Sequence, residues 1–356
     1  MEIPLGQRLK ELPGPLLLTG HTGFKGTWMT FLLEHLNIPV VGYSLPAEKY
    51  SLFERAERTG AIPEEFSDIR DYEALERFID LHKPSTIIHM AAQPIVLKSY
   101  ESPRETFDVN VMGTVNVLDI AFKKDYVNAI IVVTTDKVYR NDNSGRPFVE
   151  SDPLEGKDPY SASKVGTEAV VSAWQHIAKI SGGPKVISVR AGNVIGGGDF
   201  ADNRIIPDLI RGIQTNQPVE IRNLESSRPW QHVLDPLIGY LKLISTDETS
   251  SRIKYLNFGP QEESLTVRDV IEIAKEVFPE LEVKYLKKNL VEVQNEAHVL
   301  ALDSFQAFNS IGWKTQLNQH GAISTTFEWW KQYLTNAGKA ETLCRDEIAI
   351  FLKRLI

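Results

Sequence analysis

The sequence predicts an α/β fold: a doubly wound parallel sheet with helices on both faces, followed by a smaller C-terminal α/β domain. Two observations support this. The first half alternates short, β-branched-rich apolar runs with longer amphipathic stretches, as expected for buried parallel strands joined by helices. Past residue 192 a glycine-rich loop and shorter, more polar elements replace that alternation. A chain of 356 residues is long enough for two such domains.

Five apolar runs are the expected strands of the first half: 15–20, 38–45, 85–92, 129–136 and 185–191. Each is short and rich in β-branched residues, which favours a strand over a helix. Between them, apolar residues at helical spacing predict helices over 26–37, 104–124 and 160–180. The run 254–259 has the same texture as the first five, so we expect the sheet to gain a late strand.

The second half predicts shorter elements. Helical spacing covers 204–215, 266–277 and the tail 322–356, while 218–223 and 281–286 have the pattern of short strands. These elements are expected to build the smaller domain. Its boundary with the first domain is discontinuous, because the late strand returns to the first sheet.

Composition and charge exclude several classes of protein. Lys and Arg number 39 against 47 Asp and Glu, so the net charge is −8 and we expect no nucleic-acid partner. Cys344 is the single cysteine, which excludes a disulfide framework and fits a reducing cytoplasm. The eight histidines have no metal-ligand spacing, so we expect no metal. No apolar run approaches the ~18 residues of a membrane span, so we expect a cytoplasmic protein without a membrane partner.

A glycine-rich loop follows the first expected strand. Gly20, Gly23 and Gly26 stand in GHTGFKG, directly before the helix predicted over 26–37. Glycine allows the backbone to bend and to approach a pyrophosphate closely, and the helix N-terminus supplies free N–H groups. The spacing is one residue longer than the usual dinucleotide fingerprint. Its position between strand and helix favours a dinucleotide site over a simple turn.

The end of the second strand lacks the acidic residue with which many NAD sites bind ribose hydroxyls. It reads Gly42-Tyr43-Ser44-Leu45 and also lacks an arginine for the 2′-phosphate of NADP, so it does not distinguish the two cofactors. Ser44 can bond a ribose hydroxyl instead. Asp68, after an expected third strand, is either an acceptor for the adenine amino group or a solvated turn residue.

Tyr160 and Lys164 are the strongest catalytic candidates. They lie four residues apart in YSASK and therefore share one face of a helix. A nearby ammonium group lowers the pKa of a tyrosine and makes it a usable base. Such a pair also occurs by chance, but here the preceding strand ends in VTTDK (133–137), at the edge where open α/β sheets bind ligands. We expect these side chains to converge there.

Together these segments resemble the extended short-chain dehydrogenase/reductases of the NAD-dependent epimerase/dehydratase family. The resemblance also rests on HMAAQP (89–94) and NVMGT (110–114). The strings RAGNVIGGGD (190–199) and RPWQHVL (228–234) are most similar to its CDP-glucose 4,6-dehydratase branch. The resemblance implies a Rossmann-type NAD-binding domain over 1–190, with a late strand near 230–260, and a sugar-nucleotide substrate domain over 191–356.

The resemblance further implies NAD as cofactor and a nucleotide sugar as substrate. The positions that match the family's cofactor site are Gly20, Thr22, Gly23, Phe24, Gly26, Ser44, Asp68, Ile69, Ala91, Ala92, Gln93, Asn110, Thr134, Tyr160 and Lys164. Those that match its substrate site are Gln93, Asn193, Arg204 and Arg228. Guanidinium forks suit the oxygens of a diphosphate. Arg190 and His232 are weaker candidates for the same site.

The implied reaction converts CDP-glucose to CDP-4-keto-6-deoxyglucose by internal oxidation, elimination of water and reduction. Tyr160 takes the C4 hydroxyl proton as hydride leaves C4, with Thr135 bonded to the same oxygen and Lys164 beside it. Asp136 protonates the C6 hydroxyl, which leaves as water. Lys137 stands where related dehydratases have a glutamate. It either removes the C5 proton as a neutral amine or stabilises the C5 enolate as an ammonium.

Three alternatives stay open at this point. They are a 4,6-dehydratase of a dTDP-, GDP- or UDP-linked hexose or heptose, a nucleotide-sugar C4 epimerase, and a catalytically silent nucleotide sensor. An epimerase needs no acid and base for C5 and C6, so Asp136 and Lys137 speak against it. A sensor needs no tuned base, so Tyr160 and Lys164 speak against that one.

The helices at 104–124 and 160–180 carry apolar residues beyond one core-facing stripe. These residues are Val109, Val111, Val115, Val117, Val165, Val170, Val171 and Trp174. A helix that is apolar on more than one side needs a second partner. Because related enzymes pair these two helices into a four-helix bundle, we expect a homodimer.

Overall fold

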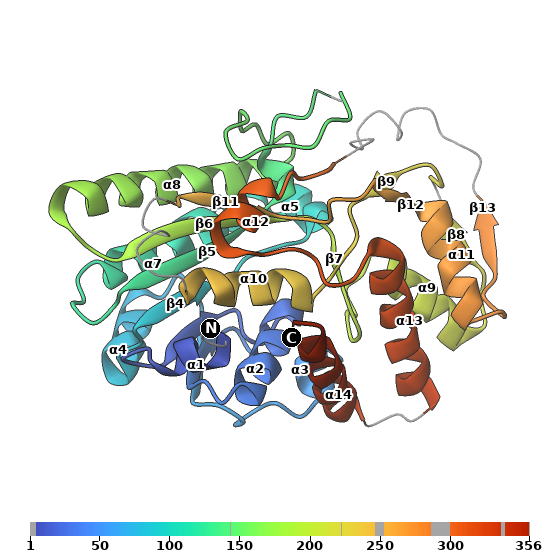
Figure 1. The fold of residues 1–356 in the computed structure, drawn as a ribbon, viewed down its shortest axis with the longest axis horizontal. Helices are drawn as coiled ribbons and strands as arrows, with labels where there is room; N and C mark the ends of the chain where they lie inside the picture. Colours follow the sequence, from blue (N-terminus) through green and yellow to red (C-terminus); the bar gives the residue numbers. More distant parts are fainter. Residues whose placement is uncertain are drawn as a thin grey trace.

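A seven-stranded parallel sheet forms the centre of the computed structural model, which describes residues 5–142, 144–221, 223–245, 253–285, 300–335 and 339–355 (Figure 1). The strand order is β11-β6-β5-β4-β1-β2-β3, and every neighbouring pair is parallel. The strands are β1 (Leu16–Thr19), β2 (Val40–Ser44), β3 (Glu64–Phe66), β4 (Thr86–His89), β5 (Ala129–Thr135), β6 (Lys185–Ala191) and β11 (Tyr255–Phe258). The predicted doubly wound sheet and its late strand are therefore confirmed.

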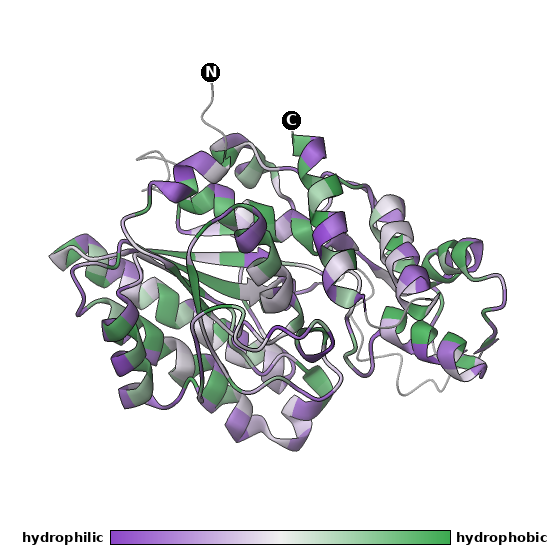
Figure 2. Ribbon diagram, turned by 90° about the horizontal axis from the view of Figure 1, so that it is seen from below, coloured by the Kyte–Doolittle hydropathy of each residue, from purple (hydrophilic) through white to green (hydrophobic). Residues whose placement is uncertain are grey.

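Consecutive strand residues serve opposite cores, because side chains alternate across a sheet. Leu16 and Leu18 belong to one apolar core and Leu17 to the other. The first core contains α2 (Phe24–His35) and α10 (Leu234–Ile244); the second contains α4 (Tyr72–His82) and α7 (Gly113–Ala121) and receives Val171 of α8 (Pro159–Ser181). Figure 2 shows the central strands in green and purple residues on the outer helix surfaces.

The helix expected over 104–124 is found over 103–121, and its middle segment is π-helical instead of α-helical. It consists of α6 (Pro103–Phe107), a π-helical segment (Asp108–Met112) and α7. π-Helical turns are rare and occur mostly at functional sites. This one contains Asn110, whose carbonyl oxygen accepts from the hydroxyls of Thr114 at 2.7 Å and Thr167 at 2.9 Å. The wide turn therefore ties this segment to α8.

The second lobe lies at the right of Figure 1 and is mostly helical. It contains α9 (Ile205–Thr215), α11 (Val267–Val277) and α13 (Gln319–Thr335). Its short strands pair as β7 (Val194–Ile195) with β10 (Gln231–His232), β8 (Val219–Ile221) with β13 (Val283–Tyr285), and β9 (Ser227–Arg228) with β12 (Leu265–Thr266). The elements expected at 204–215, 218–223, 266–277 and 281–286 are all found, although residues 222 and 286 lie outside the described residues.

The expected helical tail divides into α13 and α14 (Ala340–Leu352), with a 3₁₀ turn at Lys353–Leu355; residues 336–338 and 356 lie outside the description. Helix α14 returns to the first half, where Arg345 binds Glu34 of α2 at 2.9 Å. The division at residue 190 stays a prediction, and this contact crosses it. The sequence analysis did not predict helices α4 and α10. It also did not predict the shorter helices α1 (Leu5–Lys10), α3 (Leu52–Arg55), α5 (Val96–Glu101) and α12 (Phe305–Ile311). No helix in the described ranges is both long and apolar enough to cross a membrane.

Candidate active site

The glycine loop lies at the carboxyl end of β1, where the strand order reverses between β1 and β4. This switch point is where open α/β sheets bind ligands. Gly20 has φ +73°, and a Cβ there would lie 2.7 Å from the amide nitrogen of Ala91, just after β4. A Cβ on Gly26 would lie 2.2 Å from the carbonyl oxygen of Gly20. Both glycines are therefore required by the packing of the loop.

Gly23 has a different role because it faces outward. It is exposed, and a Cβ there would meet nothing closer than 3.4 Å. It is the N-cap of α2 and supplies no side-chain cap, while Phe24 begins the helix and packs on the first core. The helix therefore presents an uncapped N-terminus at the switch point, which favours an anion such as a pyrophosphate.

His21 of the loop is fully buried and serves the packing. Its Nε2 lies 2.8 Å from Oε2 of Glu64 on β3, and its ring meets Phe53 edge to face and stacks on Phe66. A Cβ on Gly42 would lie 2.6 Å from this ring, so Gly42 makes room for it. Burial lowers the pKa of His21 against the opposing effect of Glu64.

The two positions expected to bind the adenosine half differ in their surroundings. The hydroxyl of Ser44, at the end of β2, lies 2.8 Å from that of Thr22, and both residues are buried at the loop. Asp68 is held by Arg70 at 2.6 Å, and this guanidinium keeps the pKa of Asp68 below its usual range. Its neighbour Ile69 is buried against Gly113. Of the two positions, Ser44, with Thr22, therefore offers uncharged hydroxyl groups beside the loop, whereas Asp68 is part of an ion pair.

Gln93 is hydrogen-bonded to residues of its own region of the chain. Its backbone nitrogen donates to Asn110 Oδ1 at 2.8 Å, and its side-chain Nε2 donates to the Thr106 hydroxyl at 2.9 Å. The Asn110 side chain also donates to Ser163 at 2.8 Å, one helical turn after α8 begins. Gln93 and Asn110 therefore hold the segment after β4 against α8, while Ala91 and Ala92 form its half-buried start.

Thr135, Asp136, Tyr160 and Lys164 converge as predicted; we refer to these four residues as the catalytic cluster. Thr135 ends β5, and Asp136 opens a 3₁₀ turn (Asp136–Val138). The Thr135 hydroxyl donates to Asp136 Oδ1 at 3.0 Å and also bonds Tyr160. Burial raises the pKa of Asp136. Within the described chain no group hydrogen-bonds its other oxygen, the buried Oδ2.

The expected lowering of the Tyr160 pKa is not found, because burial outweighs it. Burial raises the pKa of Tyr160 to about 12, while the Thr135 bond opposes the rise. Lys164 is buried and donates to the carbonyl oxygen of Val133 at 3.2 Å. Burial lowers the pKa of Lys164 to about 8. Lys137 is half-buried, with Nζ 6.0 Å from the centre of the Tyr160 ring.

Lys25 is a site residue that the sequence analysis missed. Burial lowers its pKa to about 7, helped by the charges of Lys164 and Arg204 and opposed by Asp136. The glycine loop therefore places a second amine within electrostatic range of Lys164 and Asp136. A signal was present in the sequence, because a lysine in the first turn of a helix opposes the helix dipole and needs another reason to be there.

The second lobe contributes the arginines expected to bind a diphosphate. The charge of Arg204 acts on Tyr160, and that of Arg228 acts on Asp136, so both lie within electrostatic range of the catalytic cluster. Arg204 is partly exposed and pairs with Asp199 at 3.0 Å. Asn193 is half-buried, and its carbonyl oxygen accepts from Gln231 at 3.0 Å, which joins β7 to β10.

Three other candidates point away from the site. Arg190 is buried in an ion pair with Glu168, so the expectation that it binds a diphosphate is wrong. His232 is fully buried and lies 2.5 Å from Glu347 of α14, so it is equally unavailable. The hydroxyl of Thr134 donates to Glu168 at 2.6 Å rather than toward the loop. Among the described residues, no group of His, Cys, Asp and Glu could hold a metal ion.

Comparison with known proteins agrees with this geometry. The NAD dependent epimerase/dehydratase family matches residues 16–257. The chain is 38% identical to CDP-glucose 4,6-dehydratase of Salmonella typhimurium, covering 90% of this chain and 91% of that protein. It is 25% identical to dTDP-glucose 4,6-dehydratase of Haemophilus influenzae, covering 91% and 99%. UDP-glucose 4-epimerase of Thermus thermophilus in complex with NAD has the same fold, with TM-score 0.77 at 23% identity over 89% of this chain and 99% of that one.

The family match contains the glycine loop, the strand end at 133–137 and the start of α8, the segments that meet at the switch point. It covers most of the chain, and the Salmonella relative extends the similarity through the second lobe. The predicted resemblance and its NAD cofactor are therefore confirmed. The chain belongs to the NAD dependent epimerase/dehydratase family.

Proposed function

We propose that this protein is a nucleotide-sugar 4,6-dehydratase whose substrate is CDP-glucose. The observation that carries the proposal is Asp136, a buried carboxyl with a raised pKa and an unpartnered oxygen, linked to Tyr160 through Thr135. Elimination of water needs a proton donor at this position, whereas oxidation alone does not. The choice of CDP-glucose is supported by the Salmonella CDP-glucose 4,6-dehydratase, 38% identical over 90% of the chain.

The residues around the glycine loop fit NAD. The outward-facing Gly23 and the uncapped N-terminus of α2 suit its pyrophosphate. Thr22 and Ser44 offer paired hydroxyls to a ribose and no cation for a 2′-phosphate. NAD⁺ held there would supply the acceptor for the C4 hydride and, once reduced, the donor of the hydride to C6. The other cofactor positions follow from the resemblance alone.

Tyr160 and Thr135 handle the C4 hydroxyl. Tyr160 takes its proton, and Thr135, which bonds Tyr160, holds the same oxygen. The high pKa of Tyr160 makes its phenolate a strong base but a rare species, so oxidation needs a positive charge nearby to stabilise it. Lys164, one helical turn further along α8, supplies that charge when it is protonated.

Asp136 and Lys137 carry the elimination. The new C4 ketone makes the C5 proton acidic, and Lys137 lies beside the Tyr160 ring, where it can remove this proton or stabilise the enolate. Asp136 gives its proton to the C6 hydroxyl, which leaves as water. Burial favours the protonated form of Asp136 that this step requires.

Arg204 and Arg228 are proposed to bind the diphosphate of the substrate, with Asn193 beside them. Both arginines act electrostatically on the catalytic cluster, so a diphosphate between them would lie next to the sugar. Gln93, a further candidate for the same site, contributes through the packing of its segment, because its side chain is bonded to Thr106 and to the backbone of Ile95.

Incubation of the purified protein with CDP-, dTDP-, GDP- and UDP-glucose tests the proposal. We expect a 4-keto-6-deoxy product from CDP-glucose and little from the others. Product from a different nucleotide would keep the reaction and change the substrate. Conversion to a C4 epimer without any 4-keto product would favour an epimerase. Nucleotide-sugar binding without turnover would favour a sensor.

A homodimer through α8 and the segment before α7 is also proposed. Phe107 and Met112 are 40% and 50% exposed, and Ile177 of α8 is 41% exposed. They differ from the residues expected from the sequence, since Val117 and Val171 are buried in the second core. We expect light scattering to give a dimer.

A matched pair of variants tests the dimer. Met112→Glu introduces a charge into the proposed interface and should give a monomer. Leu81→Glu changes a residue of α4 that is 75% exposed, outside this surface, and should leave the dimer intact. A monomeric wild type at micromolar concentration would contradict the proposal.

A further inference from the structure

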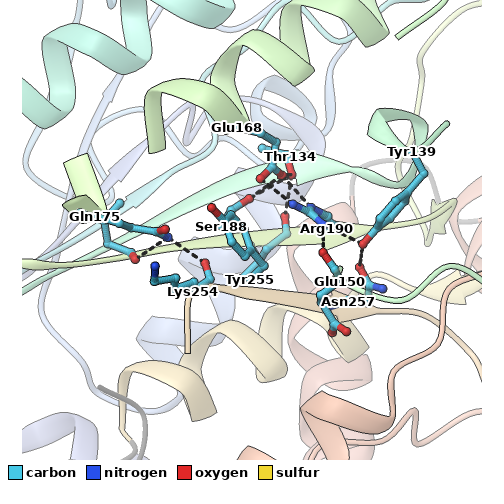
Figure 3. Close-up of polar contacts among 12 residues, drawn as sticks. Thr134, Tyr139, Glu150, Glu168, Gln175, Ser188, Arg190, Lys254, Tyr255 and Asn257 are labelled. Carbon is cyan, nitrogen blue, oxygen red and sulfur yellow. Dashed lines mark hydrogen bonds and ion pairs between the residues drawn. The ribbon is translucent and has the colours of Figure 1, made fainter. Parts of the chain in front are cut away.

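A buried carboxylate lies one helical turn beyond Lys164, and the proposed mechanism does not use it. Glu168 of α8 is 2% exposed. Its carboxylate accepts from the hydroxyls of Thr134 at 2.6 Å and Ser188 at 2.7 Å, and from the Nε and Nη2 of Arg190 at 2.9 and 2.8 Å (Figure 3). We refer to Thr134, Glu168, Ser188 and Arg190 as the Glu168 cluster.

Arg190 continues this network toward the turn that carries Asp136. The Nη1 of Arg190 donates to the hydroxyl of Tyr139 at 2.8 Å and to the carbonyl oxygen of Glu150 at 3.1 Å. Tyr139 lies directly after the turn Asp136–Val138, and its hydroxyl donates to Asn257 Oδ1 at 2.7 Å. The guanidinium therefore binds both α8 and the segment that follows the catalytic turn (Figure 3).

The end of β5 is held from the same side. The hydroxyl of Thr134 bonds Glu168, and the carbonyl oxygen of Val133 accepts from Lys164. Both contacts therefore join the end of β5 to side chains of α8. The helix brings Tyr160, and the strand end brings Asp136, so the distance between base and acid depends on this connection.

Stability alone does not explain the ion pair. Replacing a buried ion pair by apolar residues of similar volume is often neutral or stabilising, because the charges lose their hydration. A role of the pair in fixing local geometry is the alternative that the structure can test. Here the geometry is the join between α8 and the turn at 136–138, which Arg190 makes with a planar fork and a third donor nitrogen.

We propose that Arg190 and Glu168 are positioning residues that hold the Asp136–Lys137 turn in register with Tyr160 on α8. The inference rests on the proposed dehydratase function. A displaced turn would leave oxidation at C4 to Tyr160 and Thr135 and would slow elimination, because proton delivery to the C6 oxygen depends on the place of Asp136. The pair therefore sets the ratio of the rate of dehydration to the rate of C4 oxidation, which we call the partition.

Arg190→Lys and Tyr139→Phe test the connection from its two ends. Lysine keeps the positive charge beside Glu168 but lacks the fork, and phenylalanine removes only the hydroxyl that Arg190 contacts. With CDP-glucose we expect C4 oxidation, followed by the absorbance of reduced nicotinamide in a single turnover, to change less than about threefold. Release of the 4-keto-6-deoxy product should slow about 10- to 100-fold.

Gln175→Leu is the matched control. Gln175 is a buried residue of the same helix, and its side chain donates to the carbonyl oxygens of Val186 at 3.1 Å and Lys254 at 3.0 Å (Figure 3). It bridges α8 to β6 and β11 without touching the turn. This variant should lose stability and keep the wild-type partition. The same partition change in Gln175→Leu would overturn the proposal, because it would follow from general loosening.

Amide hydrogen exchange provides a readout that does not need activity. Peptides covering 136–141 should exchange faster in Tyr139→Phe and Arg190→Lys than in the wild type and Gln175→Leu. Unchanged exchange overturns the proposal, and so does faster exchange with an unchanged partition. If the wild type forms no 4-keto product from any nucleotide sugar, the proposed function fails, and exchange alone then decides whether the pair holds the turn.

Discussion

Two buried polar clusters lie one turn apart along α8, and they differ in how completely their polar atoms are paired. In the Glu168 cluster, one carboxylate accepts four hydrogen bonds, two of them from a single guanidinium. In the catalytic cluster, Asp136 has a buried oxygen with no hydrogen-bond partner among the described residues. Burial also lowers the pKa of Lys164 and raises that of Tyr160.

The difference separates two uses of a buried charge. A buried polar group that lacks a partner costs free energy, so a folded protein retains one where another benefit offsets the cost. In the proposed function, the substrate supplies the missing partner of the unpaired oxygen in the catalytic cluster. The Glu168 cluster, whose carboxylate is fully hydrogen-bonded, instead fixes how the same helix packs on the sheet. Removing the unpaired acid of the catalytic cluster should therefore lower activity without lowering stability. Unpairing the Glu168 cluster should lower stability.

The largest expected effect is on activity, at Asp136. Asp136→Asn removes the proposed acid and should slow product formation by about 10²–10⁴-fold, the usual contribution of general acid catalysis. Oxidation at C4 should persist and appear as reduced-nicotinamide absorbance. Tyr160→Phe is the comparison variant and should suppress that absorbance itself. Elimination at the wild-type rate in Asp136→Asn would remove Asp136 from the mechanism.

The next effect is on stability, at Arg190. Arg190→Met leaves the Glu168 carboxylate buried without its cation and should lower the free energy of unfolding by about 3–5 kcal/mol. Urea denaturation followed by circular dichroism measures it. The double variant Arg190→Met, Glu168→Leu removes both charges and should recover most of the loss. If both variants were equally unstable, shape rather than charge would account for the loss.

A smaller effect of opposite sign is expected for the stability of Asp136→Asn. Burial raises the pKa of Asp136, so the folded state holds a proton that the unfolded chain releases more readily. The protonated Asp136 therefore stabilises the folded state relative to the unfolded chain. This contribution is fully present below the pKa of Asp136 in the unfolded chain and is lost as the pH rises through its pKa in the folded state. The variant should therefore be more stable than wild type by about 0.5–2 kcal/mol at pH near 8. Unfolding curves at several pH values should converge toward acid pH; a constant difference would contradict this account.

The smallest effect is expected at Thr134. Thr134→Val removes one of the four hydrogen bonds to the Glu168 carboxylate and should cost about 1–2 kcal/mol of unfolding free energy, because the acceptor is charged. Thr326→Val in α13 is the control, since its hydroxyl donates to the neutral carbonyl oxygen of Ala322 at 2.8 Å. Equal losses in the two variants would show that the charge of Glu168 adds nothing to the bond.

The elements that local patterns could predict are those whose burial is set by their own sequence. The strand runs alternate between two cores, so their apolar character shows directly in the residue order. The glycine loop and YSASK were recognisable because their residue types are required at fixed spacing. The π-helical turn at Asp108–Met112 was not predictable, because the segment keeps helical spacing and the Asn110 carbonyl oxygen is bonded by Thr167 of another helix.

The sequence by itself determined the sheet, the loop and which residue types could carry the chemistry, since each depends on periodicity or spacing along the chain. Only the tertiary structure decided which charged groups meet. Arg190 was a candidate for a diphosphate until the fold placed it against Glu168. Burial lowers the pKa of Lys25, and the charges of Lys164 and Arg204, which are distant in the sequence, lower it further. Charges interact through space, and a buried charge is paired or shifted by whichever neighbours the fold supplies.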